Sequence, residues 1–172
     1  ETDSRILMEL DQLYKKLNYP PAERLAFLER HMNLVEERDD LFVERIALYN
    51  QLGRYEKAKE LCDSRKFHPW EGGEGKITYQ YTYCRLQLAK RAIGKGDFRE
   101  ALQYLNETDA YPHNLGEGKL CTVNENDVDY YKGICYRGLN DEESAAKWFA
   151  KATRGPVEPK QAFYYNDEHP DK

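Results

Sequence analysis

Apolar residues recur every three or four positions along most of the chain, a spacing typical of amphipathic α-helices rather than strands. The clearest runs lie in residues 4–18, 20–35, 42–69, 85–112 and 130–156. Residues 79–83 (YQYTY) alternate like a strand, but helical spacing continues directly after them, so we expect a helix there as well. The pattern predicts an all-α protein.

Three of these runs repeat one plan. In each, a helix ends at a turn, a second helix follows, and a proline closes the unit. Successive turns are 43 and 44 residues apart and fall at Gly53, Gly96 and Asn140. Self-similarity at such a period indicates stacked supersecondary units of the same kind.

Each recurring residue has a physical reason. Glycine or asparagine after the first helix can take the left-handed conformation of a C-terminal cap. A small residue at a constant distance past the turn lets two antiparallel helices approach closely, and proline marks the exit because it cannot continue a helix. The small residues are Ala58, Ala101 and Ala145, and the prolines are Pro69, Pro112 and Pro156. Aromatic residues are predicted to fill the space between neighbouring hairpins; these are Tyr49, Tyr55, Phe98, Tyr136 and Phe149.

The pattern resembles the tetratricopeptide repeat, a helix–turn–helix unit of about 34 residues. The match is best at Gly133, Tyr136, Asn140, Ala145, Phe149, Ala152 and Pro156. Each unit here is longer by about nine or ten residues, which fall between the hairpins. The resemblance implies a right-handed α-solenoid of about four antiparallel helix hairpins.

We expect one domain over 1–172 that is cut from a longer protein. Its expected parts are a degenerate first hairpin at 1–38, repeat units at 39–69, 76–112 and 124–156, and a linker into a missing repeat at 157–172. Pro20 and Pro21 suit the start of a helix, and Asp39 or Asp40 is the expected N-cap of the next.

Two lengthened connectors share a glycine–lysine ending: HPWEGGEGK (68–76) and YPHNLGEGK (111–119). A phosphate-binding loop of the form GxxxxGK[ST] would need glycine where the chain has Trp70 and His113. It would also need serine or threonine where the chain has Ile77 and Leu120. Nucleotide binding through these loops is therefore excluded.

Two interpretations of the loops remain. In the structural one, the glycines turn the chain between hairpins and Trp70 is a packing wedge. In the other, the loops form a ligand or interface surface, because a tryptophan beside carboxylates suits a sugar. The candidate residues are His68, Trp70, Glu71, Glu74, Lys76, His113, Glu117 and Lys119.

A second candidate surface is the concave groove of the expected solenoid, lined by the first helix of each hairpin. Its lining is mixed polar, aromatic and basic, which suits an extended peptide or a neighbouring domain. The candidates are Asn50, Gln51, Tyr83, Lys90, Tyr130 and Arg137, with Val43, Ala47, Leu86, Ile93, Asp127 and Ile134 beside them.

Composition narrows the function classes. The chain has 172 residues and a net charge of −5, without a run of lysine and arginine, so nucleic acid is a poor partner. No apolar stretch is long enough to span a membrane. The four cysteines form no CxxC pair, the four histidines are scattered, and no serine lies in a GxSxG motif. We therefore expect no catalytic, cofactor or metal site; the cysteines are predicted to be buried thiols in a cytoplasmic protein.

The two loops, together with RDDLFVERIALYNQLGRYEKAKEL (38–61), resemble the C-terminal repeat region of large uncharacterised bacterial proteins. The N-terminal half of those proteins is similar to carbohydrate-active enzymes. The resemblance implies a sugar-related context for a parent protein. The expected function is a non-enzymatic scaffold or docking module for protein or interdomain contacts; the alternative is an accessory module that completes a carbohydrate site through the two loops.

Overall fold

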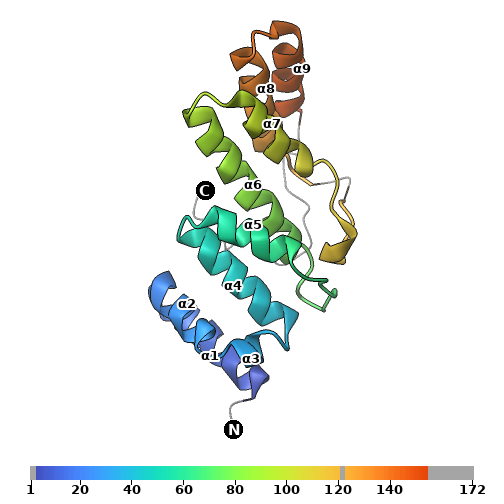
Figure 1. Ribbon diagram of the computed structural model, residues 1–172. Helices are drawn as coiled ribbons and strands as arrows, with labels where there is room; N and C mark the ends of the chain where they lie inside the picture. The colour runs from blue at the N-terminus through green and yellow to red at the C-terminus, as the bar shows by residue number, and fades with distance from the viewer. Residues whose placement is uncertain (1–2, 121–122, 155–172) are drawn as a thin grey trace.

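The computed structural model describes residues 3–120 and 123–154, and within them every regular element is a helix (Figure 1). The helices are α1 (Ser4–Lys16), α2 (Pro21–Glu29), α3 (Met32–Val35), α4 (Asp39–Gln51), α5 (Tyr55–Asp63), α6 (Lys76–Gly94), α7 (Phe98–Glu107), the 3-10 turn η1 (His113–Leu115), α8 (Asn126–Gly138) and α9 (Glu142–Ala152). The all-α prediction is confirmed, including residues 79–83, which lie inside α6.

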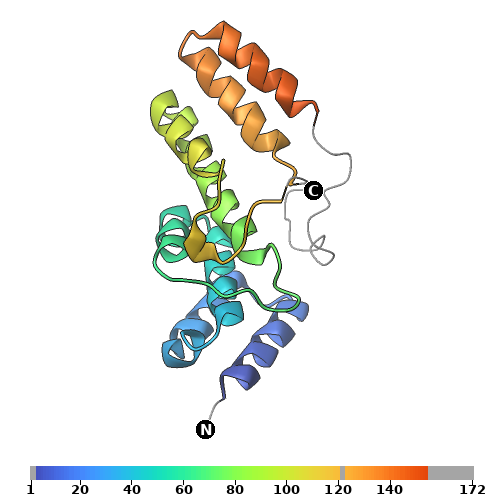
Figure 2. The same ribbon diagram turned by 90° about the vertical axis from the view of Figure 1, so that its right-hand side faces the viewer.

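Helices that are adjacent in sequence pack against each other. The main contacts join α4 to α5, α5 to α6, α6 to α7, α7 to α8 and α8 to α9. The molecule is consequently elongated, with α1–α3 at one end and α8–α9 at the other (Figures 1 and 2). None of the described helices is long and apolar enough to cross a membrane.

The turn within each helix pair has the predicted chemistry. Gly53, Gly96 and Asn140 have φ of 70°, 81° and 62°, the left-handed conformation that a helix C-terminus favours. Ala58, Ala101 and Ala145 are all buried. The prediction of a capped turn followed by a close helix–helix contact is therefore confirmed at all three positions.

The aromatic residues divide into two groups. Phe98 lies against Gly138, where a Cβ atom would come within 2.4 Å of the ring, so α7 packs on α8 as expected for a contact between pairs. Tyr55 meets Tyr83 of α6 edge to face, with ring centroids 6.1 Å apart. For Phe149 the expectation of a contact between pairs was wrong: its ring packs on Gly133 of α8, inside its own pair, because glycine leaves room there.

The N-terminal part differs from a simple hairpin because α3 adds a short helix. Pro21 occupies the first turn of α2, as predicted. The N-cap of α4 is Arg38, so the expectation of Asp39 or Asp40 was wrong; both lie in the first turn, where carboxylates favour the positive end of the helix dipole.

A buried charge cluster joins α1, α2 and α4. The Arg24 guanidinium donates to the Asp11 carboxylate at 2.6 and 3.0 Å and to Glu44 at 3.0 Å. Burial raises the pKa of Asp11, whereas for Glu44 the charges of Lys15 and Arg24 outweigh burial and lower the pKa. These paired charges fix how the first helices sit on α4.

Cys62, Cys84 and Cys135 are free and buried, as predicted. Burial raises the pKa of Cys135 to about 11, so this thiol stays protonated at neutral pH. Cys121, Pro156 and the expected linker 157–172 lie outside the described residues.

Candidate functional site

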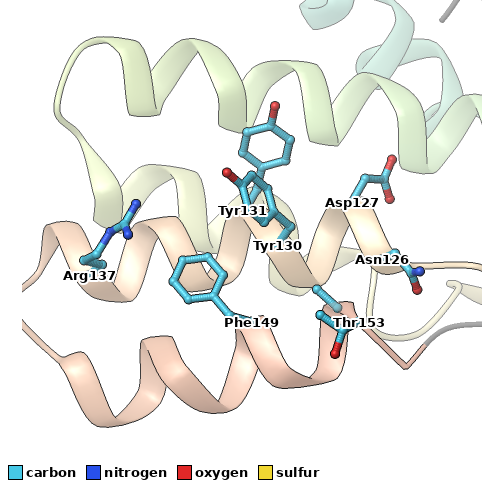
Figure 3. A pocket seen from close by; sticks show the side chains of 8 residues that line it. Asn126, Asp127, Tyr130, Tyr131, Arg137, Phe149 and Thr153 are labelled. Atoms are coloured by element: carbon cyan, nitrogen blue, oxygen red, sulfur yellow. The ribbon is translucent and has the colours of Figure 1, made fainter.

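An open groove lies along the C-terminal helix pair (Figure 3). It has a volume of about 600 Å³ and will be called the α8–α9 groove. Its lining residues are Asn126, Asp127, Tyr130, Tyr131, Arg137, Phe149, Ala152 and Thr153. All come from α8, from α9 or from the residue after α9, so one helix pair supplies the whole site.

The floor of the groove is aromatic. The ring centroids of Tyr130 and Phe149 are 5.6 Å apart, and the two rings are inclined at 52°. The ring centroids of Tyr130 and Tyr131 are 5.5 Å apart. Phe149 reaches this position because α8 carries Gly133 opposite it. Tyr130 remains 47% exposed, although tyrosine is a residue that folded proteins usually cover more fully.

Cationic side chains flank the aromatic rings. The Arg137 guanidinium carbon lies 5.2 Å from the centroid of the Phe149 ring. The amino group of Lys90, in α6, lies 5.2 Å from the centroid of the Tyr131 ring. Both distances suit a cation–π contact, which holds each cation beside the groove without neutralising its charge. The groove therefore presents positive charge next to apolar rings.

The two ends of the groove differ in charge. Asp127 lies in the first turn of α8 and Arg137 in its last turn, ten residues and about 15 Å apart along the helix. Figure 3 shows Asp127 and Arg137 at opposite ends, with Tyr130 and Phe149 between them. An apolar centre with one acidic and one basic end suits an elongated ligand that carries both kinds of group.

Other predicted groove residues are placed differently. Asn50 is buried and donates from Nδ2 to the Gln80 side-chain oxygen at 2.8 Å, so it joins α4 to α6 and is not available to a ligand. Gln51 is exposed at the end of α4. Tyr83 contacts Tyr55 and Tyr79, away from the α8–α9 groove. The structure thus brings together Tyr130 and Arg137, with Lys90 at their edge, and separates them from the other three candidates.

The two glycine–lysine connectors lie side by side and bind each other (Figure 2). Residues 64–75 and 108–120 will be called the loop pair. The Phe67 amide donates to the Asn114 carbonyl at 2.7 Å, and the Asn114 side chain donates to the Cys62 and Arg65 carbonyls at 2.9 and 3.0 Å. The Gly75 amide, at the start of α6, donates to the Glu117 carboxylate at 2.7 Å.

Most candidate loop residues therefore have structural partners. Lys119 donates to the Thr108 and Asp109 carbonyls at the end of α7 and pairs with Glu125. Trp70 is half-buried, packs on the apolar core, and covers Gly73, whose Cβ position lies 2.0 Å from the indole ring. His68 is exposed, but its amide and ring both bind Asp39.

The remaining loop candidates lie apart from the groove. Glu71, Glu74 and His113 are exposed, and Lys76 is the first residue of α6. No group of three or more metal-ligating side chains occurs among residues 3–120 and 123–154.

Sequence reasoning missed five groove residues, which are Asn126, Tyr131, Phe149, Ala152 and Thr153. The signal that was present is the tyrosine doublet 130–131, since two adjacent residues of a helix point about 100° apart and a doublet on a helix that is polar on one side leaves one ring near the surface.

No protein-family model matches the chain, and no solved structure matches it.

Proposed function

We propose that this chain is a non-catalytic docking module that binds a segment of a protein in the α8–α9 groove. The segment belongs to a partner protein or to a neighbouring domain of a longer protein. In this proposal the helix pairs form a right-handed solenoid of the tetratricopeptide kind. The observation that carries it is the aromatic floor of the groove, formed by the exposed Tyr130 and the half-buried Phe149 and bounded by Asp127 and Arg137.

The chemistry of the lining supports a protein ligand. Tyrosine and arginine are the residues most enriched where protein contacts contribute most binding free energy, because each combines a large apolar surface with hydrogen-bonding groups. The apolar middle would take one aliphatic or aromatic anchor, and Arg137 would pair with a carboxylate near one end of the segment. The same left-handed geometry recurs at three turns of the chain, which supports a repeat scaffold beneath the groove.

Site-specific photocrosslinking in cells that produce the protein tests this proposal. A photoreactive phenylalanine analogue at Tyr130 is expected to give a discrete protein adduct, whose crosslinked peptide mass spectrometry then identifies. The matched control places the same analogue at Lys147, which is exposed on α9 but does not line the groove. Adduct formation that is equal at both positions, or absent at Tyr130, would contradict the proposal.

A purified-component experiment separates this ligand class from sugars. The crosslinked segment, made as a peptide, is expected to bind the wild-type protein and to lose about tenfold or more in affinity with Tyr130→Ala or Arg137→Glu. Trp70→Ala is expected to leave that affinity unchanged. Binding of mono- or oligosaccharides that depends on Trp70 would instead favour a carbohydrate role for the loop pair.

A further inference from the structure

Helix α1 carries a second exposed apolar surface, at the opposite end of the molecule from the α8–α9 groove. Ile6 and Leu13 of α1 are 54% and 49% exposed, Leu17, the C-cap residue of α1, is 59% exposed, and Leu10 lies between Ile6 and Leu13 in the helix. These four residues will be called the α1 stripe. Figure 2 shows α1 at the edge of the molecule, near the N-terminus.

The α1 stripe is separate from the face that α1 buries. Leu7 and Asp11 point into the core, and Tyr14 contacts Tyr19 and Phe27 on the same side. At 100° per residue, the stripe is centred about 120° away from Leu7 and Asp11. Helix α1 therefore has one apolar face toward its own protein and another toward solvent.

The spacing of the stripe is that of a coiled-coil seam. Positions 6, 10, 13 and 17 alternate steps of four, three and four residues, which are the d and a positions of a heptad. A stripe with this spacing packs best against another helix that has the same spacing. A second copy of α1 supplies such a helix.

Charge selects the direction of that second helix. Glu9 and Lys16 are exposed, and both flank the stripe on the edge away from the core; Glu9 also pairs with Arg5, one turn earlier in the same helix, at 3.0 Å. When two copies of α1 run antiparallel about a two-fold axis between positions 11 and 12, Ile6 meets Leu17 of the other copy and Leu10 meets Leu13. The same arrangement brings Glu9 near Lys16 of the other copy, twice, by symmetry. In a parallel pair, Glu9 of one copy would lie beside Tyr14 of the other copy, and tyrosine offers no positive charge to pair with the carboxylate.

We propose that the α1 stripe is a self-association surface, through which two copies of this chain pair as an antiparallel, two-fold α1–α1 contact. This inference is independent of the ligand of the α8–α9 groove. One short helix from each copy makes an interface at the small end of the range for specific contacts, so the dimer forms reversibly as concentration rises.

Sedimentation velocity over a concentration series is the first test. The wild-type chain is expected to shift from monomer to dimer, and Leu13→Glu, in the centre of the seam, is expected to remain monomeric. The matched control is Leu120→Glu, because Leu120 is a similarly exposed leucine (54%) outside α1. Circular dichroism of each variant checks that it is folded. A wild-type monomer at every concentration, as expected if another segment covers the stripe, would overturn the proposal, and so would a dimer that survives Leu13→Glu.

Charge reversal tests the antiparallel direction. Glu9→Lys alone and Lys16→Glu alone are each expected to weaken the dimer about fivefold to tenfold, because each places like charges opposite one another. An equal mixture of the two variants restores opposite charges at both contacts and is expected to dimerise at least as tightly as the wild type. A mixture that associates no better than either variant alone would overturn the antiparallel arrangement.

Discussion

The loop pair and the α8–α9 groove both contain aromatic and charged residues, but they use them in opposite ways. In the loop pair, Asn114, Glu117 and Lys119 direct their polar atoms to backbone groups of the same molecule, and Trp70 packs on Gly73 and the core. In the groove, Tyr130 and Phe149 contact each other and leave ring surface open, with Arg137 held beside them.

The difference shows what a glycine-rich, charged connector does between two helix pairs. A long connector leaves many backbone groups without helical partners, and those groups need hydrogen bonds wherever they are buried. Side chains from one connector supply those bonds to the other, so the polar residues that looked available for a ligand are already satisfied. A helix pair has no such need, and in the α8–α9 pair Tyr130 remains exposed.

The largest effect is expected from Gly116→Ala in the loop pair. Gly116 has φ of 73°, and a Cβ atom there would lie 2.5 Å from the Phe67 carbonyl oxygen. Left-handed strain and the clash together are expected to lower the free energy of unfolding by about 2 to 4 kcal/mol. Urea denaturation measures the change.

Gly118→Ala is the matched control for that substitution. Gly118 lies two residues away, and its Cβ position has no neighbour within 4 Å. A change below about 0.5 kcal/mol is expected there. Equal losses for the two variants would show that the contact between the loops does not hold the region together.

A smaller and more direct contrast comes from truncating one aromatic residue in each region. Trp70→Ala is expected to cost about 2 kcal/mol, less than the 3 to 5 typical of a fully buried aromatic, because Trp70 is only half-buried. Tyr130→Ala is expected to cost less than about 1 kcal/mol, since nearly half of Tyr130 is exposed, yet it should lower the affinity of the groove for the crosslinked peptide about tenfold or more. If Tyr130→Ala destabilised the protein more than Trp70→Ala, the groove would be the region that stabilises the fold. The assignment of a structural role to the loop pair and a binding role to the groove would then be wrong.

The helices and the turns could be predicted from the sequence more completely than the residues of the candidate site. Left-handed caps at Gly96 and Asn140 and close contacts at Ala101 and Ala145 follow from local chemistry, so periodicity and spacing were enough to predict them. Placement of Asn50 in the α4–α6 contact depends on Gln80, thirty residues away, and no local pattern encodes that pairing.

The same limit applied to the candidate site. Tyr130 and Arg137 were predicted from the face of one helix, and the structure places both in the groove. Phe149 was assigned to packing between pairs, because the sequence does not reveal that Gly133 would receive its ring. Groove residues that lie on the same face of one helix could be predicted. Residues that come together only when two helices pack could not.

The smallest expected effect is the pH dependence of the loop pair, tested with Glu117→Gln. Burial raises the pKa of Glu117 more than the hydrogen bond from the Gly75 amide lowers it, and the charge of Glu74 adds to the rise. The folded state therefore holds this proton more tightly than the unfolded state, so the carboxyl contributes stability at low pH that is lost as the pH rises through the raised pKa.

Glutamine at position 117 keeps an oxygen that can accept a hydrogen bond from the Gly75 amide, but it does not titrate. The stability of Glu117→Gln relative to the wild type should therefore increase from about pH 4 to about pH 7. A relative stability that stayed flat with pH would place Glu117 in solvent and remove one of the bonds that distinguish the loop pair from the groove. A relative stability that fell with pH would mean that the hydrogen bond from Gly75 outweighs burial.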